Sequence, residues 1–339
     1  MTVHLKDIAA YTGVSIKTVS NVVNGNNTKV GPETRRLVLE AIDKLQYQPN
    51  VAARQLRKSH VGVLAYAIPD LSNPYFADMG NEITAAAAEL DYTMLLDYTF
   101  SAHDKELHVV KGLRPHLIDG VLLDSQSLDI MDLHPDEVRG KLVLLGERLF
   151  VAPFDHVLVD NVAAAYQATT HLLHLGRKRI AAIGVQKNSS EAPSLRFEGY
   201  VQALREVGQP LDPTLLMSGG FWHRVDGASA MQQLLDLDSP PDAIFCFNDL
   251  MALGAMSVLH ARGYRIPEDV AVVGFDDIED GRYAYPPLTT ISPDKHALAH
   301  LAVSLLIERI KGTRTGPPEC VNVPFQLLPR HSTLGRAPS

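Results

Sequence analysis

The chain has 339 residues, of which 46% are hydrophobic and 6% aromatic, which is enough for two or three domains with their own cores and excludes a disordered chain. The formal net charge is -8, but residues 1–60 carry nine Lys or Arg against four Asp or Glu, a net charge of +5, so the remainder carries -13. A basic head on an acidic body suits a DNA-binding module joined to a domain that does not itself adhere to DNA, with a chance fluctuation of composition as the alternative.

The first predicted elements are two short helices. The first spans residues 5–13 and ends at Gly13, which suits the left-handed cap conformation. Ser15 is placed to cap the second by accepting a hydrogen bond from a backbone N–H. One face of this second helix is apolar, and the other side carries Ile16, Lys17, Thr18, Ser20 and Asn21. The pattern predicts a helix-turn-helix in which residues 13–25 enter a DNA groove.

A third helix is predicted to begin near Gly31 and Pro32, because proline suits the first helical position. Its apolar residues recur at helical spacing and close a three-helix head, residues 1–46. Residues 47–60 follow as a hinge or linker. Asn50 is placed to cap a short helix over residues 51–57, which is too short to persist alone in water, and a plain linker is the alternative.

From residue 61 onward, short apolar runs alternate with amphipathic helices, which predicts an α/β fold with doubly wound parallel sheets. Two similar lobes are expected, with a seam near Asp160. Ligands of such folds bind beyond the carboxyl ends of the strands. The expected strands are 61–68, 93–98, 120–124, 141–147, 156–159, 179–184, 215–219, 243–247 and 270–275, and the expected helices are 75–90, 162–175, 194–207, 226–235, 250–262 and 296–311.

Motifs along nearly the whole chain resemble the LacI/GalR family of bacterial transcription regulators. They are LKDIAAYTGVSIKTVSNVVNG, TRRLVLEAIDKLQYQPNVAARQLR, IPDLSNPYF, FNDLMALGAM, VVGFDD, PPLTTI and LLPRHST. The resemblance implies a two-lobed core like that of periplasmic binding proteins, residues 61–339. Lobe 1 would comprise 61–160 and 291–322, and lobe 2 would comprise 161–290 and 323–339. It also implies a homodimer that reads a near-palindromic operator.

The resemblance further implies that Ile16, Lys17 and Asn21 distinguish operators in the major groove. Relatives most often carry arginine where Asn21 stands. Asparagine favours a bidentate contact to adenine and arginine favours guanine, so we expect an unusual operator base opposite Asn21. Leu56 matches the hinge leucine that wedges into the minor groove, with Ala53 and Arg57 beside it. The other positions expected at or next to DNA are Leu5, Lys6, Ser15, Thr18, Ser20, Asn24, Lys29, Tyr47 and Asn50.

An effector cleft between the lobes is also implied. The positions that match ligand contacts of the family are Asn73, Tyr75, Phe76, Glu147, Arg196, Trp222, Asn248, Asp249 and Asp276. Trp222 offers a flat apolar face for a sugar ring, and polar neighbours suit its hydroxyls. Structural alternatives stay open: Asn248 and Asp249 suit a helix start, Asp276 a loop cap, and Trp222 packing. Glu147 favours a polyol, whereas Arg196 keeps an acidic ligand open.

Other classes of protein find little support. Cys246 and Cys320 form neither a disulfide framework nor a zinc motif, and the HxxH of His171 and His174 is a weak metal signal. No GxSxG, Walker or HExxH motif is present, so we expect no enzyme, cofactor or metal. The N-terminus does not resemble a signal peptide and no apolar run is long enough to span a membrane, so we expect a cytoplasmic protein. The expected function is a repressor released by a carbohydrate, with corepressor-dependent regulation or a sugar-binding transport protein as alternatives.

Overall fold

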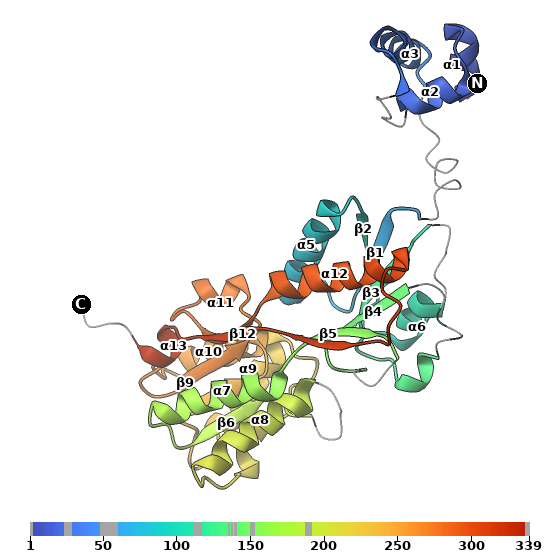
Figure 1. The fold of residues 1–339 in the computed structure, drawn as a ribbon. Coiled ribbons are helices and arrows are strands. Elements are labelled where there is room, and N and C mark those ends of the chain that lie inside the picture. Colours follow the sequence, from blue (N-terminus) through green and yellow to red (C-terminus); the bar gives the residue numbers. More distant parts are fainter. Residues whose placement is uncertain are drawn as a thin grey trace. The chain divides into compact units, whose positions relative to one another are not determined.

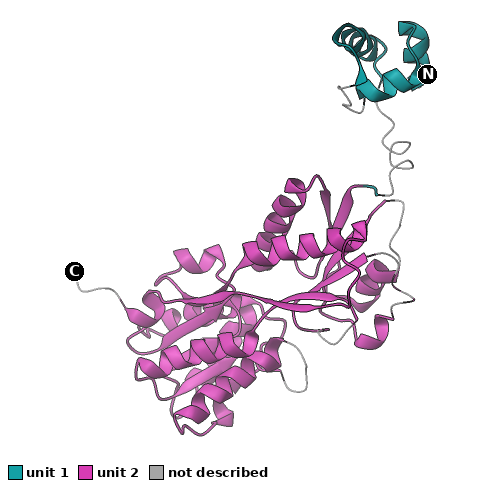
Figure 2. Ribbon diagram, viewed as in Figure 1, with its two compact units in different colours: residues 1–61 teal, residues 62–339 magenta. Residues whose placement is uncertain are grey.

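The computed structural model describes residues 3–23, 29–47, 60–111, 117–134, 136, 138, 141–149, 153–186 and 192–335. The chain divides into two compact units, residues 1–61 and 62–339 (Figure 2). The predicted helix over residues 51–57 lies outside the described residues.

The first unit is the predicted head of three helices, α1 (Leu5–Thr12), α2 (Ile16–Val23) and α3 (Pro32–Lys44) (Figure 1). Gly13 ends α1 with φ of 70°, a conformation in which glycine carries no side-chain strain. The backbone N–H of Thr18 donates to Ser15 Oγ at 3.1 Å, so Ser15 caps α2 as predicted. Ile8, Val19 and Val38, one from each helix, are fully buried and form the centre of the head core.

The second unit contains two six-stranded sheets. The first has the order β11-β5-β4-β3-β1-β2 and all its pairs are parallel. Alternate residues of β1 face opposite layers: Leu64, Tyr66 and Ile68 pack with α5, and Ala65 and Ala67 pack with α6. The elements of this lobe are β1 (Val63–Ile68), α5 (Pro74–Glu89), β2 (Thr93–Tyr98), α6 (His103–Lys111), β3 (Gly120–Asp124), β4 (Lys141–Leu145), β5 (Asp155–Val159), α12 (Lys295–Lys311) and β11 (Cys320–Val323).

The second sheet has the order β12-β10-β9-β8-β6-β7, and only β12 runs antiparallel to its neighbour among the described strands. Helices α7 and α8 pack together, as do α9 and α10. The elements are α7 (Asn161–His174), β6 (Ile180–Ile183), α8 (Ala192–Glu206), β7 (Leu216–Met217), α9 (Arg224–Leu235), β8 (Ala243–Cys246), α10 (Asp249–Ala261), β9 (Ala271–Phe275), α11 (Glu279–Tyr283), β10 (Thr289–Pro293), β12 (Phe325–Leu328) and α13 (His331–Leu334).

The chain passes between the two lobes three times: from β5 to α7, from β10 to α12, and from β11 to β12 (Figure 1). The second passage differs from the expected position after residue 290, because β10 continues in the second sheet to Pro293. No helix in the described ranges is long and apolar enough to cross a membrane.

Candidate functional site

The head exposes the start of α2. Ile16 is 53% exposed, and Ser15 and Lys17 are exposed beside it, while Thr18, Ser20 and Asn21 are half-buried. The exposed side chains at the start of α2 combine apolar, polar and basic groups, which suits contact with base edges and phosphates.

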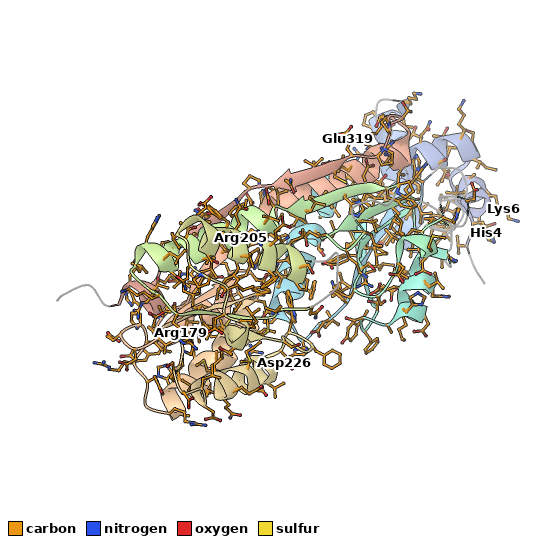
Figure 3. The ribbon with its side chains drawn as sticks, turned by 90° about the horizontal axis from the view of Figure 1, so that it is seen from below. His4, Lys6, Arg179, Arg205, Asp226 and Glu319 are labelled. Atoms are coloured by element: carbon orange, nitrogen blue, oxygen red, sulfur yellow. The ribbon has the colours of Figure 1, made fainter. Side chains whose placement is uncertain are left out.

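The remaining head positions divide into three groups. Lys6 and Lys29 are exposed, and Figure 3 shows Lys6 on α1. Leu5 and Tyr47 are half-buried and pack against the head core, so they also serve the fold. The others, Asn24, Asn50, Ala53, Leu56 and Arg57, lie outside the described residues.

A cleft of about 790 Å³ lies between the two lobes, with lining residues from both. It lies at the carboxyl ends of the parallel strands. Asp124 ends β3, Gly146 follows β4, Asn248 follows β8 and Asp276 follows β9, and all four line the cleft. This is the position in which doubly wound sheets bind ligands. Eight of the nine predicted effector residues line it: Asn73, Tyr75, Phe76, Glu147, Arg196, Trp222, Asn248 and Asp276.

Arg196 is the central cation of the cleft and is only 8% exposed. Its Nε donates to Asn161 Oδ1 at 2.6 Å, and its Nη1 donates to the backbone oxygen of Phe247. The guanidinium lies 3.5 Å from the ring centroid of Phe275 and 5.4 Å from that of Trp222. These contacts fix the arginine and use two of its nitrogens on protein groups, which lowers its capacity to bind an anionic ligand in a fork.

Carboxyl groups surround this arginine. Burial, together with the nearby Glu147, Glu106 and Asp276, raises the pKa of Asp124 to about 8, and a hydrogen bond from Gln126 opposes this shift. Burial also raises the pKa of Asp276 to about 6, opposed by the charges of Arg196 and Lys295. The pKa of Glu147 is raised by burial as well. The cleft therefore combines hydrogen-bonding carboxyl groups with an excess of acids, which suits a neutral polyhydroxylated ligand.

Two asparagines of the cleft also begin helices. Asn73 Oδ1 accepts from the N–H of Tyr75 at 3.1 Å and caps α5. Asn248 Oδ1 accepts from the N–H of Met251 at 2.9 Å and caps α10, while its Nδ2 donates to the Trp222 backbone oxygen at 2.9 Å. Asn248 thereby ties the start of α10 to the loop that presents the Trp222 ring.

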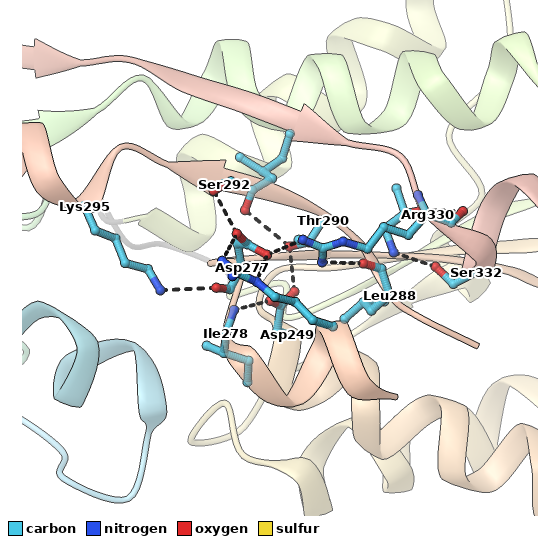
Figure 4. Close-up of polar contacts among 12 residues, drawn as sticks. Asp249, Asp277, Ile278, Leu288, Thr290, Ser292, Lys295, Arg330 and Ser332 are labelled. Carbon is cyan, nitrogen blue, oxygen red and sulfur yellow. Dashed lines mark hydrogen bonds and ion pairs between the residues drawn. The ribbon is translucent and has the colours of Figure 1, made fainter. Parts of the chain in front are cut away.

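Asp249 is a correction, because it does not line the cleft. Its carboxylate accepts from the N–H of Ile278 at 2.9 Å and from Thr290 Oγ1 at 2.7 Å, and the residue is fully buried (Figure 4). As the first residue of α10, it directs its side chain into the second lobe and joins β10 to the segment after Asp276. Its contacts are structural.

Several lining residues carry no match in the sequence prediction. Tyr66 is fully buried on β1, and its hydroxyl has no hydrogen-bond partner in the described part of the chain. No sequence pattern marked Tyr66 as a cleft residue, because a tyrosine within a predicted buried strand is expected in the core. The sequence offered a usable signal for Asp124, because its carboxylate stands at the end of a predicted strand, where doubly wound sheets bind ligands. The others of polar or aromatic character are Asp70, Ser72, Tyr98, Phe100, Ser101, Ser125, Gln126, Arg148, Gln186, Phe221, His223 and Phe275.

Glu106 holds the loop that follows β3. It is fully buried in α6, and its carboxylate accepts from Ser125 Oγ at 2.8 Å and from the N–H groups of Gln126 at 3.0 Å and Ser127 at 3.1 Å. These three hydrogen bonds join α6 to the loop that follows β3. Glu106 in α6 therefore fixes the loop beside Asp124.

Two families match this chain. Residues 4–50 match the family described as bacterial regulatory proteins, lacI family, and residues 169–333 match the one described as periplasmic binding protein-like domain. The HTH-type transcriptional repressor CytR of Escherichia coli strain K12 is 34% identical over 316 residues, which cover 92% of this chain and 91% of CytR. The HTH-type transcriptional regulator RegA of Clostridium saccharobutylicum is 31% identical over 98% of this chain and 100% of its own.

Solved structures agree with these sequence matches. The Lac repressor dimer bound to operator and the anti-inducer ONPF has a TM-score of 0.85 at 27% identity, covering 98% of this chain and 100% of its own. A complex of the transcriptional regulator CelR with cellobiose has a TM-score of 0.72 at 32% identity, covering 97% of this chain and 99% of its own. The similarity thus extends over both units.

Proposed function

The chain belongs to the LacI family of bacterial regulatory proteins and is a DNA-binding transcriptional regulator, and we propose that it is a repressor released from its operator by a small carbohydrate. The observation that carries the carbohydrate assignment is the cleft. It combines the ring of Trp222 with carboxyl and amide groups at fixed positions. The relative CelR is known in complex with cellobiose, which supports this class of ligand.

The charge of the cleft favours a neutral ligand over a phosphorylated or carboxylated sugar. Four carboxyl residues line it, Asp70, Asp124, Glu147 and Asp276, against the arginines Arg148 and Arg196. Burial keeps Asp124 protonated at neutral pH, so the other three acids, Asp70, Glu147 and Asp276, are the ones that would repel an anionic ligand. A neutral polyol instead offers hydroxyl groups that both donate to carboxylates and accept from Arg196.

Operator reading is proposed for the exposed side of α2, with Asn21 as the residue that sets this protein apart. Binding sites selected from random DNA by the wild type and by Asn21→Arg should differ at one base of each half-site, with adenine exchanged for guanine. Identical selected sites would contradict the role of Asn21. Lys6→Ala serves as the control: it should weaken binding to all sequences alike, because a phosphate contact carries no base information.

The hinge proposal concerns Leu56 and rests on the family resemblance alone. Leu56→Ala should weaken operator binding by at least about tenfold, since a wedge that bends the DNA opens further contacts. Binding of effector to the core should stay unchanged, because the cleft is built within residues 62–339. Equal operator affinity in the two proteins would refute the wedge.

A homodimer is proposed because near-palindromic operators require a two-fold reader. Strand β2 supports the assignment. It is the edge strand of the first sheet, and Leu95 and Leu96 are 47% and 55% exposed on it, with Leu90 nearby at 43%. An edge strand with consecutive exposed leucines is a surface that a soluble protein ordinarily covers. Sedimentation should show a dimer for the wild type and a monomer for Leu96→Arg.

Release from the operator is the central test. A thermal-shift screen of neutral sugars identifies those that bind, and fluorescence anisotropy of the selected operator then reports release. Each binding sugar should lower operator affinity, since a ligand shifts the equilibrium by its difference in affinity for the two states. Tighter operator binding would instead identify a corepressor. Binding of sugar without any retention of DNA by the chain would favour the transport-protein alternative.

A further inference from the structure

The outer end of the cleft carries aromatic rings in addition to Trp222, whose ring is proposed to contact one sugar ring. Tyr98 and Phe100 stack with their ring centroids 3.7 Å apart, and Phe100 is 57% exposed. Phe221, next to Trp222, is 89% exposed. All three line the cleft. Phenylalanine is ordinarily buried, so two exposed rings at the border of a ligand cleft indicate a surface that is covered in another state.

Both exposed rings sit on backbones that the fold holds firmly. The residues on either side of Phe100 are bonded to the end of β1, through Thr99 N to the Ile68 oxygen at 2.9 Å and Ser101 Oγ to the Pro69 oxygen at 3.3 Å. Lys105 Nζ lies 4.9 Å from the centroid of the Phe100 ring. The ring is thus presented in one place, which lowers the entropy lost on binding.

The loop of Phe221 is equally constrained. Gly220 has φ of 52°, and a Cβ atom there would lie 2.3 Å from Asp226 Oδ1, so only glycine fits. The N–H of Trp222 donates to the Gly219 oxygen at 2.7 Å. Figure 3 labels Asp226 in α9, directly after this loop. The chain therefore holds Phe221 outward on a rigid turn instead of letting it fold into the core.

Contacts of neighbouring residues bring the segments of Phe100 and Phe221 to the same end of the cleft. His223, two residues after Phe221, has its Nε2 3.6 Å from Asp70 Oδ2 in the other lobe. Asp70 follows Pro69, which bonds to Ser101 next to Phe100. The lobes therefore meet where the aromatic residues lie. Asp70 and His223 add polar groups there that suit sugar hydroxyls.

We propose that this outer end is a second sugar subsite, in which Phe100, stacked on Tyr98, and Phe221 hold a second pyranose ring, so that the effector is a disaccharide. The inference rests on the proposed carbohydrate function. Trp222 and Arg196 at the inner end hold the first ring. A cleft of about 790 Å³ is in the upper part of the range of about 300–1,000 Å³ that encloses drug-sized ligands, and a single pyranose is much smaller than these.

The test is calorimetric titration of the full chain with matched pairs of neutral sugars: glucose with cellobiose and maltose, galactose with lactose, and xylose with xylobiose. For the pair that binds, the disaccharide should bind at least about tenfold more tightly than its monosaccharide, a difference that one additional buried ring face accounts for. Phe100→Ala and Phe221→Ala should each remove most of this preference and leave monosaccharide affinity within about twofold.

Two further variants separate the ring contact from general damage. Phe221→Tyr keeps the ring and should keep the preference. Tyr283→Ala removes an aromatic ring that is 81% exposed on α11, outside the cleft, and should leave both affinities unchanged. The subsite is overturned if the monosaccharide binds as tightly as the disaccharide, if the preference survives both alanine variants, or if these variants weaken both sugars alike. Failure of every sugar to bind would overturn the carbohydrate assignment itself.

Discussion

Replacing Asp124 by asparagine should make the protein more stable at alkaline pH. Asp124 is 8% exposed at the end of β3, and burial raises the pKa of its carboxyl to about 8. Asparagine has nearly the same shape and keeps an oxygen that accepts from Gln126 Nε2, a bond of 2.9 Å in the wild type. The substitution therefore removes the ionisation of the side chain and little else.

The sign follows from proton linkage. Between the unfolded pKa near 3.8 and the folded pKa near 8, the folded state binds the proton that the unfolded state has lost. The stability that this carboxyl contributes is present below pH 3.8 and is lost as pH rises through 8. Each pH unit in the window is worth up to about 1.4 kcal/mol. Wild type should therefore lose about 4 kcal/mol relative to Asp124→Asn between about pH 5 and pH 8.

Urea unfolding of both proteins across this pH range, followed by fluorescence of the sole tryptophan, Trp222, measures the difference. The gap between the two free energies of unfolding should widen up to about pH 8 and then stay level. Asp238→Asn, at an exposed position, should follow the wild-type curve. A gap that does not change with pH would refute the claim that Asp124 is protonated in the cleft at neutral pH.

Three further substitutions, measured by thermal or urea unfolding, test contacts that stabilise the two units. Arg309→Ala should cost about 3–5 kcal/mol, because Asp155, only 2% exposed, loses the guanidinium that bonds it at 2.6 and 3.0 Å; a loss near zero would contradict the pairing. Gly254→Ala should lower the free energy of unfolding by about 3 kcal/mol, because the new Cβ would lie 1.9 Å from a backbone oxygen of α9. Gly316→Ala should change the stability little, because the space around Gly316 is open. Ser15→Ala should cost the head about 1 kcal/mol, and unchanged stability would disprove the cap.

The strands of the two series were predictable because they read as short apolar runs, although the edge strand β2 is largely exposed. Strands β2 and β3 occupy the predicted residues, 93–98 and 120–124. The last three strands were not picked out as such. Strand β10 contains three polar residues and ends in proline, and β11 and β12 are separated only by Pro324. Their pairing, for example Thr290 with Leu328, joins residues far apart in the chain, and no local pattern encodes it.

The residues of the proposed effector site were predicted from the family resemblance, and the strand order accounts for part of that prediction. Strand ends converge at one edge, which is why Asp276 and Asn248 line the cleft. Side-chain direction is a different matter. Asp249 follows Asn248 directly, yet one residue of helical rotation points its carboxylate into the core. The exposure of Phe221 was not predictable from a sequence pattern, because it depends on the conformation of the glycines in its loop.

The residue after Asp276 connects the cleft to the passages between the lobes. Asp277 Oδ1 accepts from Arg330 at 2.6 Å, and its backbone oxygen accepts from Lys295 Nζ at 3.3 Å (Figure 4). Lys295 also donates to Asp78 on α5 at 2.7 Å, and so links the second lobe to the first. A ligand that bonds Asp276 thus acts one residue from an ionic network that spans both lobes. A ligand that binds one arrangement of these contacts more tightly would shift the lobes toward it by its difference in affinity, which is what the proposed release from DNA requires.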